Sequence, residues 1–385
     1  MYFQQKDLDM LHCKYYLKVT FAILFFSQAF LTVGIGQLSN TDNAIISNFK
    51  QISAIPFNDY VNDQRDIILI SELHNVSCTY EILEHVIQQN LQRGFGHIIQ
   101  EMPFSYSIVC NAFVETGDTT LLNLISSSEE AKYFFKRIRQ LSMQTAANTK
   151  PHFWGIDFEL GASRIKYLKA AMSILLTKYS FDKKIQQILG EIKNKESVEE
   201  IQVLNNELKL HLDLVVGDNK ESYDEGLALL QMIANRNTEY VKHRDSQLYQ
   251  NFLEIDRLVR MKENRPKYIG SFGLAHINTA LKNSFSRILL NDHNWTARTS
   301  IIGTQYYRCE SNYGLKKTTT ISEIGVLPNS ISKLVQNEIE NIQSPSVFVL
   351  KPTPNSKIKR ALDYSLVLVL VNYPGESINT QRIYE

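Results

Sequence analysis

Apolar strand-like runs alternate with helical patterns along much of the chain. The run Asp66–Ile70 is continuously apolar after its first residue and largely β-branched, which suits a strand buried on both faces. Apolar side chains recur at helical spacing from Thr79 to Gln92, and Gly94–Gly96 then separates this predicted helix from a second strand that begins at His97. The pattern therefore predicts a strand–helix–strand unit with short connections.

The same alternation continues toward the C-terminus. Further helices are predicted over 129–148, 163–179 and 225–260, and further strands over 151–156, 268–272, 299–304 and 365–371. Such an order predicts an α/β fold with a mainly parallel central sheet flanked by helices. The segment 182–224 is charged and apolar by turns, which indicates a solvent-facing helical hairpin or lid inserted at about 180–225. Without an internal repeat or a low-complexity linker, 37–385 is predicted to be a single domain.

The N-terminus is typical of a targeting segment. Lys14 and Lys18 precede an apolar stretch, Val19–Ile35, and the small residues of Gly34–Gly36 come before Gln37 as at a cleavage site. The stretch is about 17 residues long and contains a glutamine, whereas a membrane span needs ~20 apolar residues. We therefore predict a signal peptide over 1–36 and a periplasmic or secreted protein, with an uncleaved signal anchor as the alternative.

Charge and cysteine content narrow the partners. Lys plus Arg total 41 against 40 Asp plus Glu, a net charge of +1, which gives no reason to expect nucleic acid as a partner. A small-molecule or peptide substrate is expected instead, with no membrane contact beyond the N-terminal anchor. Cys78, Cys110 and Cys309 follow the predicted cleavage site and fit no zinc ribbon or CxxC motif, so they are buried thiols or include at most one disulfide.

Ionisable residues stand where four predicted strands end. Glu72 and His74 follow the first strand, Glu101 the second, Asp157 the third, and His276 the strand over 268–272. In an open α/β sheet, ligands bind beyond the carboxyl ends of the strands. These side chains are therefore predicted to converge on one cleft, although each taken alone could be a loop histidine or a helix-capping group.

Arg244 interrupts an otherwise apolar helical face. It shares spacings of three and four with Val241, Leu248, Phe252, Ile255 and Val259. A buried guanidinium needs an acidic partner because an unpaired buried charge is costly, and Glu101 or Glu72 is the expected one. The alternative is an ion pair that only positions the helix.

These motifs together resemble a superfamily that groups the erythromycin esterase-like, haem-binding ChaN-like and TraB/TIKI metalloprotease-like proteins. Glu72–His74 resembles the GExH of ChaN-like members, and Glu101–Pro103 is similar to their Glu-x-Pro. His243–Asp245 resembles the Arg-Asp of erythromycin esterase-like members, and Gly273–His276 is similar to a second GxxH. The chain departs from the pattern in Ser71, which replaces a glycine, and in the spacing of Glu72 to His74, so opening of a macrolide lactone is not implied.

The resemblance and the chemistry of the residues predict a hydrolase that cleaves an ester, lactone or amide. His74 is the expected general base on water, because an imidazole takes a proton near neutral pH. Glu101 would orient the water or hold Arg244, while Arg244 and His276 would stabilise the oxyanion. Asp157 and Asp245 are expected to bind substrate. The chain has no Gly-x-Ser-x-Gly motif of a serine nucleophile.

Two alternatives use the same residues differently. His74, His276, Glu72 and Glu101 are suitable ligands for Zn, Mn or Co, and the TraB/TIKI resemblance implies a metal-dependent peptidase. The ChaN-like resemblance implies a haem- or iron-binding protein without catalysis; tyrosine is one axial ligand of haem, but no tyrosine of the chain lies in a recognisable ligand motif.

Overall fold

The computed structural model describes residues 49–52, 64–74, 76–126, 128–146, 149–218, 224–236, 243–312, 318–327, 329–342, 346–350 and 366–371. Residues 44–385 form one compact unit. The predicted signal segment, its cleavage site and Val241 lie outside the described residues, so export and the boundary at 36/37 stay predictions. Within the described part, no helix is long and apolar enough to cross a membrane.

A sheet of nine strands forms the centre of this unit, in the order β1-β8-β9-β6-β2-β5-β3-β4, with β7 paired to β6. The strands are β1 (Phe49–Ile52), β2 (Ile67–Glu72), β3 (His97–Pro103), β4 (His152–Asp157), β5 (Tyr268–Gly273), β6 (Thr299–Asn312), β7 (Thr318–Gly325), β8 (Ser346–Leu350) and β9 (Leu366–Val371). The run from β9 through β6, β2, β5 and β3 to β4 is parallel, and the β1, β7 and β8 pairings are antiparallel. The predicted α/β fold with a mainly parallel sheet is confirmed.

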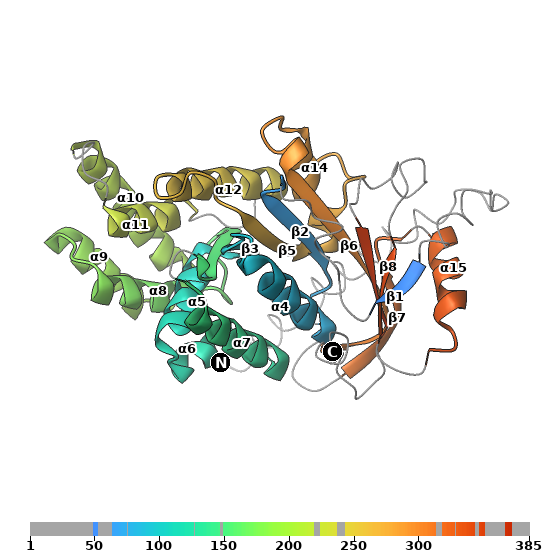
Figure 1. Ribbon diagram of the computed structural model, residues 1–385. Coiled ribbons are helices and arrows are strands. Elements are labelled where there is room, and N and C mark those ends of the chain that lie inside the picture. Colours follow the sequence, from blue (N-terminus) through green and yellow to red (C-terminus); the bar gives the residue numbers. More distant parts are fainter. Residues whose placement is uncertain are drawn as a thin grey trace, which may run out of the picture. The chain divides into compact units, whose positions relative to one another are not determined.

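Helices fill the connections between the strands (Figure 1). They are α4 (Ser77–Leu91), α5 (Phe104–Thr116), α6 (Thr119–Ile125), α7 (Glu129–Gln144), α8 (Ile165–Lys178), α9 (Lys183–Asn194), α10 (Val198–Asp218), α11 (Glu225–Asn235), α12 (Arg244–Arg260), α13 (Leu274–Ile277), α14 (Phe285–Asn291), the 3₁₀ turn η2 (Thr296–Arg298) and α15 (Asn329–Ile339). The segment predicted to be a helical hairpin or lid at about 180–225 contains α9 and α10, which Figure 1 places at one end of the unit beyond α8.

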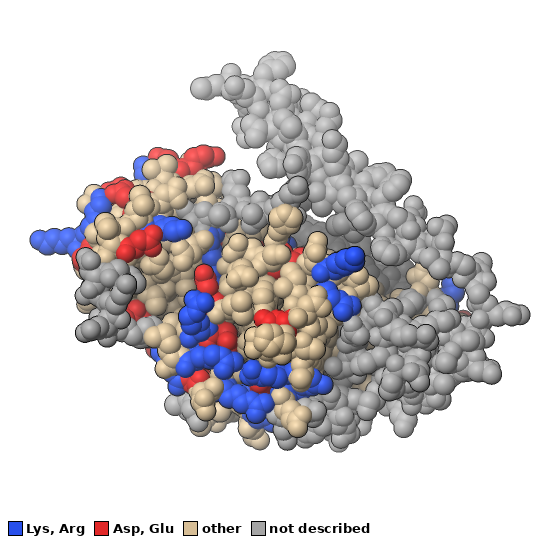
Figure 2. Space-filling model, turned by 90° about the horizontal axis from the view of Figure 1, so that it is seen from above, with Lys and Arg blue, Asp and Glu red and all other residues tan. Residues whose placement is uncertain are grey.

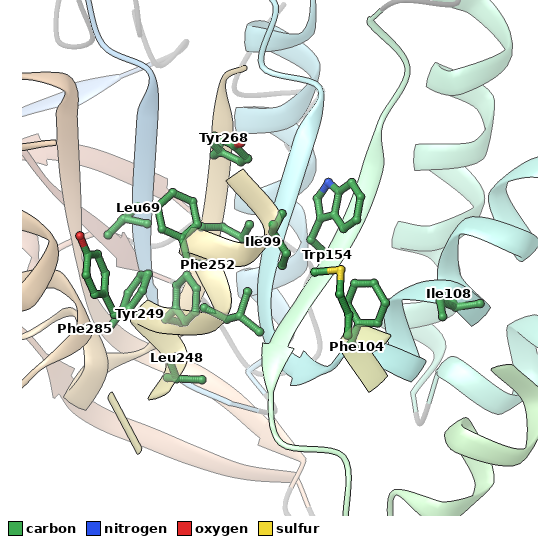
Figure 3. Close-up of a cluster of buried hydrophobic side chains, with 14 of the residues drawn as sticks. Leu69, Ile99, Phe104, Ile108, Trp154, Leu248, Tyr249, Phe252, Tyr268 and Phe285 are labelled. Atoms are coloured by element: carbon green, nitrogen blue, oxygen red, sulfur yellow. The ribbon is translucent and has the colours of Figure 1, made fainter. Parts of the chain in front are cut away.

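Alternate side chains of each central strand enter two cores, one on either face of the sheet. Ile67 and Leu69 of β2 pack with α12 and α14, whereas Ile68 and Ile70 pack with α4 and α7. Figure 3 shows the first core, in which the ring of Phe252 of α12 packs against Tyr268 of β5 and Phe285 of α14, with centroid distances of 5.2 and 6.4 Å. Because both faces of the sheet are covered by helices, a ligand can approach the sheet at the ends of its strands.

One predicted helix is wrong in extent. The helix expected over 225–260 is two helices, because α11 ends at Asn235 and α12 begins at Arg244. Arg236 directly after α11 is buried, and its guanidinium donates to Gly155 O and Asn251 O, each at 3.0 Å. These bonds fix the end of α11 against β4 and α12. Arg244 consequently lies in the first turn of a helix rather than in the middle of one.

The surface carries charges of both signs. On the face shown in Figure 2, Lys and Arg side chains lie among Asp and Glu, and uncharged surface separates the groups. This mixture accords with the net charge of +1.

Candidate functional site

The carboxyl ends of β2, β5, β3 and β4 lie next to one another in the sheet, and the candidate residues lie at these ends. The pairing of β3 with β4 shifts register between Gln100 and Pro103, which inserts one extra residue into β3. Such a bulge turns a side chain away from the regular alternation. Glu101 lies in this bulge, which places its side chain among the other candidate residues.

Glu101 is the most connected carboxylate of the site. Its Oε1 accepts from Arg244 Nη2 at 2.7 Å and lies 3.1 Å from His276 Nε2, while its Oε2 accepts from the backbone N–H of Gly273 at 3.0 Å. The side chain is 7% exposed. Burial opposes ionisation, but the hydrogen bond from His276 and the nearby positive charges outweigh it and lower the pKa of Glu101 to about 2. Glu101 is therefore a carboxylate throughout the neutral range.

Glu72 and His74 form a carboxylate–imidazole pair at the end of β2. His74 Nδ1 lies 2.9 Å from Glu72 Oε1, and Ser271 donates to the other oxygen of the same carboxylate. The hydrogen bond to Glu72 raises the pKa of His74, and burial opposes this only in part. The His74 side chain is 56% exposed, and its Nε2 lies 3.7 Å from Glu101 Oε2, too far for a direct hydrogen bond. With the proton on Nδ1, Nε2 is an open acceptor.

His276 and Asp245 form a second such pair on the other side of Glu101. Asp245 Oδ1 lies 2.6 Å from His276 Nδ1 and also accepts from the backbone N–H of Phe285 at 2.8 Å. Both ring nitrogens of His276 thus face carboxylate oxygens, so both carry protons. Burial opposes the charge, yet the bonds to Asp245 and Glu101 raise the pKa of His276 to about 9. At neutral pH this ring is an imidazolium.

Arg244 is held by two carboxylates. Besides Glu101, it binds Asp157 through Nε at 3.1 Å and Nη2 at 2.6 Å. Asp157, 1% exposed, also accepts from Arg164 Nη2 at 2.8 Å. Although burial opposes it, these bonds raise the pKa of Arg244. The predicted partner Glu101 is the one the structure records for Arg244, and Glu72 is not.

One nitrogen of the Arg244 guanidinium, Nη1, lies against His276 rather than against a carboxylate. This nitrogen lies 3.3 Å from His276 Nε2, but two protonated nitrogens cannot hydrogen-bond each other. Within the described residues, no carboxylate or carbonyl contact is recorded for Nη1. This N–H group is available to an oxygen atom that enters the site.

Two further residues of the site, Arg164 and Ser271, were not predicted from the sequence. Arg164 binds Asp157 and the carbonyl of Phe158, and its guanidinium lies 4.0 Å from the Phe158 ring centroid. Ser271 lies within a strand that reads as purely structural. Neither belongs to a motif; the only sequence signal was the excess of acidic groups at the strand ends, which implies a further cation.

The structure places all seven predicted residues in this one cluster, but in different settings. The side chain of His74 is exposed to solvent, and those of Glu72, Arg244 and His276 are partly buried. The side chains of Glu101 and Asp157 are almost fully buried. Asp157 and Asp245 bind Arg244, Arg164 and His276, and their expected role in binding substrate stays a prediction. A cavity of about 80 Å³ lies elsewhere, beside Phe104 and Trp154, and none of the seven residues lines it.

The donor set fits a divalent metal poorly. Among the described residues, no group of three His, Cys, Asp or Glu side chains is arranged to hold an ion. Physically, both oxygens of Glu101 already accept hydrogen bonds, and the neighbouring guanidinium of Arg244 and imidazolium of His276 would repel a dication. Glu101 is paired with the positively charged side chains of Arg244 and His276 rather than with a metal ion.

Gly273 forms the floor between His74 and Glu101. A Cβ built on this glycine would lie 3.0 Å from His74 Nε2 and 3.3 Å from Glu101 Oε2. Its φ of −52° is open to any residue, so the need for glycine here is steric. A side chain at this position would crowd both polar atoms.

Comparison with known proteins identifies the fold. No family model and no curated protein sequence matches the chain. A Bacillus cereus protein matches it in structure with a TM-score of 0.55 and 13% identity, over 88% of this chain and 100% of that one. A succinoglycan biosynthesis protein matches with a TM-score of 0.53 and 11% identity, over 88% and 99%.

An erythromycin esterase, EreC, solved as a histidine-to-asparagine mutant in an open conformation, matches with a TM-score of 0.52 and 11% identity. The match covers 86% of this chain and 99% of that one. At these identities the comparisons show a shared fold, which extends over nearly the full length of each neighbour.

Proposed function

We propose that this chain is a hydrolase that cleaves an ester, lactone or amide of a small molecule or peptide by general-base activation of water. The observation that carries the proposal is the open imidazole of His74, bound through Nδ1 to Glu72 at 2.9 Å and presenting Nε2 toward Glu101. A carboxylate that fixes one ring nitrogen leaves the other to take a proton. An erythromycin esterase shares the fold, which adds a hydrolytic precedent.

In the proposed first step, a water molecule donates one proton toward His74 Nε2 and the other toward Glu101 Oε2. These two acceptors lie 3.7 Å apart, close enough for one water to reach both. The water oxygen attacks the carbonyl carbon as His74 takes its proton. Because Glu101 stays ionised, it orients the water without competing for the proton.

The carbonyl electron pair moves onto oxygen, and Arg244 Nη1 stabilises the resulting oxyanion together with the positive charge of His276. Asp157 and Arg164 fix the guanidinium plane, and Asp245 fixes the His276 ring. Collapse of the tetrahedral intermediate expels the alkoxide or amine, which recovers the proton from His74. Donors of this kind are worth about 3–4 kcal/mol in other hydrolases.

The test is a hydrolysis assay with a panel of p-nitrophenyl esters, lactones and aminoacyl p-nitroanilides. His74→Ala is expected to lower kcat/KM by about 10²–10⁴-fold, as loss of a general base does. His293→Ala is the matched control, because that side chain is 93% exposed and lies outside the cluster. Circular dichroism of both variants verifies that the fold is intact.

Three results would overturn the proposal. Near-wild-type turnover by the His74→Ala variant would show that His74 is not the general base. Turnover that a chelator abolishes and Zn²⁺ or Mn²⁺ restores would assign the activity to the metal-dependent alternative. A Soret band on haem addition, with no hydrolysis of any substrate, would favour the binding role.

A further inference from the structure

Two thiols from distant parts of the chain lie against each other behind the candidate site. Cys78 is in the first turn of α4 and Cys309 is in β6, 231 positions later. The Cys78 thiol donates to Cys309 Sγ over 3.3 Å, and both residues are buried, with exposures of 1% and 0%. The third described cysteine, Cys110 in α5, packs beside Tyr106 instead.

This thiol pair adjoins the turn that carries His74. Thr79, next to Cys78, and Tyr306, three residues before Cys309, approach each other at 3.3 Å between hydroxyl oxygens. Both reach Leu73, the residue between Glu72 and His74: Thr79 donates to its carbonyl and its N–H donates to Tyr306, each over 3.4 Å. These long bonds alone hold the turn weakly.

We propose that Cys78 and Cys309 form a disulfide that ties the turn of the Glu72–His74 pair to β6. The sulfur atoms need to approach by little more than 1 Å to reach the ~2.05 Å of a disulfide. Since no third sulfur is placed to compete, the pairing is unique among the described cysteines, and Cys110 stays a thiol.

The bond forms by exchange with a disulfide of the oxidising compartment, either a small molecule or a protein. A thiolate of one cysteine attacks the donor disulfide and releases one thiol, and the second cysteine then attacks the mixed disulfide and releases the other. The two cysteines lose two protons and two electrons, and the donor disulfide is reduced to two thiols. Burial raises the pKa of the Cys78 thiol, so the exchange belongs to folding, before β6 covers α4.

A covalent link at this point has a structural consequence. It closes a loop of more than two hundred residues, for which the loss of entropy in the unfolded chain is large. It also fixes the distance between α4 and β6 on which the position of Leu73 depends. The disulfide thus stabilises the whole unit and positions the His74 turn without touching a substrate.

The decisive measurement is peptide mapping of the full chain produced in an oxidising compartment and alkylated at lysis without reductant. We expect the peptides of Cys78 and Cys309 to be joined and Cys110 to be alkylated; Cys13 is scored separately. Recovery of Cys78 and Cys309 as alkylated thiols, or either one joined to Cys110, would overturn the proposal.

Thermal unfolding with and without dithiothreitol supplies a second readout. Reductant is expected to lower the Tm of the wild type and of Cys110→Ala by about 5–10 °C. It should leave the Tm of Cys78→Ala and Cys309→Ala unchanged. Each variant is compared only with itself, so the cost of a buried cavity cancels. Equal responses of all four proteins to the reductant would contradict a Cys78–Cys309 bond.

Discussion

Glu101 decides the protonation of its neighbours. Its carboxylate lies between two imidazoles, of which His276 has a second carboxylate on its far nitrogen and is charged, whereas His74 has only Glu72 and an open Nε2. The same side-chain type therefore serves as base on one side of Glu101 and as cation on the other. The number and the distance of the neighbouring carboxylates, rather than a different side chain, separate the two roles.

The pH dependence of kcat/KM follows from this separation. His74 must be neutral to act as base, so activity rises with pH through its pKa, which Glu72 raises above 6.5. His276 must keep its charge, so activity falls as pH rises through about 9. We expect a bell-shaped profile, measured with a neutral ester. His276→Asn should lose the alkaline limb, and a wild-type profile that stays flat to pH 10 would contradict this role.

Gly273 offers a steric test of the same site. In Gly273→Ala, the new methyl group would contact His74 Nε2 and Glu101 Oε2 at 3.0 and 3.3 Å and cover both acceptors. Because the backbone conformation suits alanine, we expect about a tenfold or greater loss of kcat with little change in Tm. Kinetics and thermal unfolding together check this. Full activity would show that the water does not occupy this gap.

At the scale of elements, the bulge in β3 depends on Gly155 in the adjacent strand. A Cβ on Gly155 would lie 2.0 Å from the carbonyl oxygen of Pro103, which is rigid backbone. Gly155→Ala should therefore push the bulge and Glu101 out of place, lowering both activity and the free energy of unfolding, by about 2 kcal/mol or more.

The matched control for that substitution is Gly190→Ala. Gly190 lies in α9, and a Cβ there meets nothing within 4 Å. Alanine is the better helix former, so the free energy of unfolding should rise by about 0.5–1 kcal/mol without a change in activity. Urea denaturation of the two variants makes the comparison, and equal effects of the two would contradict the steric account.

Sequence patterns predicted those elements whose burial is one-sided or whose strands are continuous. The run ending at Glu72 and the helix after it are found at their predicted places. Helix α5 was not predicted, because it is buried on nearly every side from Phe104 to Cys110 and so has no periodicity. The split between α11 and α12 depends on the buried contacts of Arg236, which no local pattern reveals.

The candidate site was predictable in membership but not in pairing. Ionisable residues at strand ends are visible in the chain, yet strand order decides which of them meet. Nothing local to Asp157 shows that it binds Arg244 and Arg164. Such pairings arise from contacts 87 and 7 positions apart, and the sequence shows only that the charges must balance.

For the molecule as a whole, the Glu101–His276 ion pair links stability to pH. The folded pKa of His276 is raised to about 9, so its contribution is complete below 6.5 and is lost as pH rises through 9. The folded pKa of Glu101 is lowered to about 2, so its contribution is complete above 4.5 and is lost as pH falls through 2. The His276 shift, to which Asp245 contributes as well as Glu101, corresponds to about 3 kcal/mol.

We therefore expect this pair to contribute fully to stability between about pH 4.5 and 6.5. Urea unfolding of the wild type and of His276→Asn at pH 6 and pH 10 checks the effect. The difference in unfolding free energy between them should shrink by up to about 3 kcal/mol at the higher pH. A difference that is independent of pH would mean that His276 is neutral in the folded protein.

The position of β5 in the sheet has a consequence for folding during synthesis. This strand pairs with β2 on one side and β3 on the other, although β2 and β3 are synthesised about 200 and about 170 residues earlier. Until β5 is synthesised, the nascent chain has an empty slot with two apolar strand edges, a surface that invites aggregation or chaperone binding. A nascent chain that ends before Tyr268 would contain most of the acidic and basic groups of the site. Without β5 between β2 and β3, these groups would not be brought together.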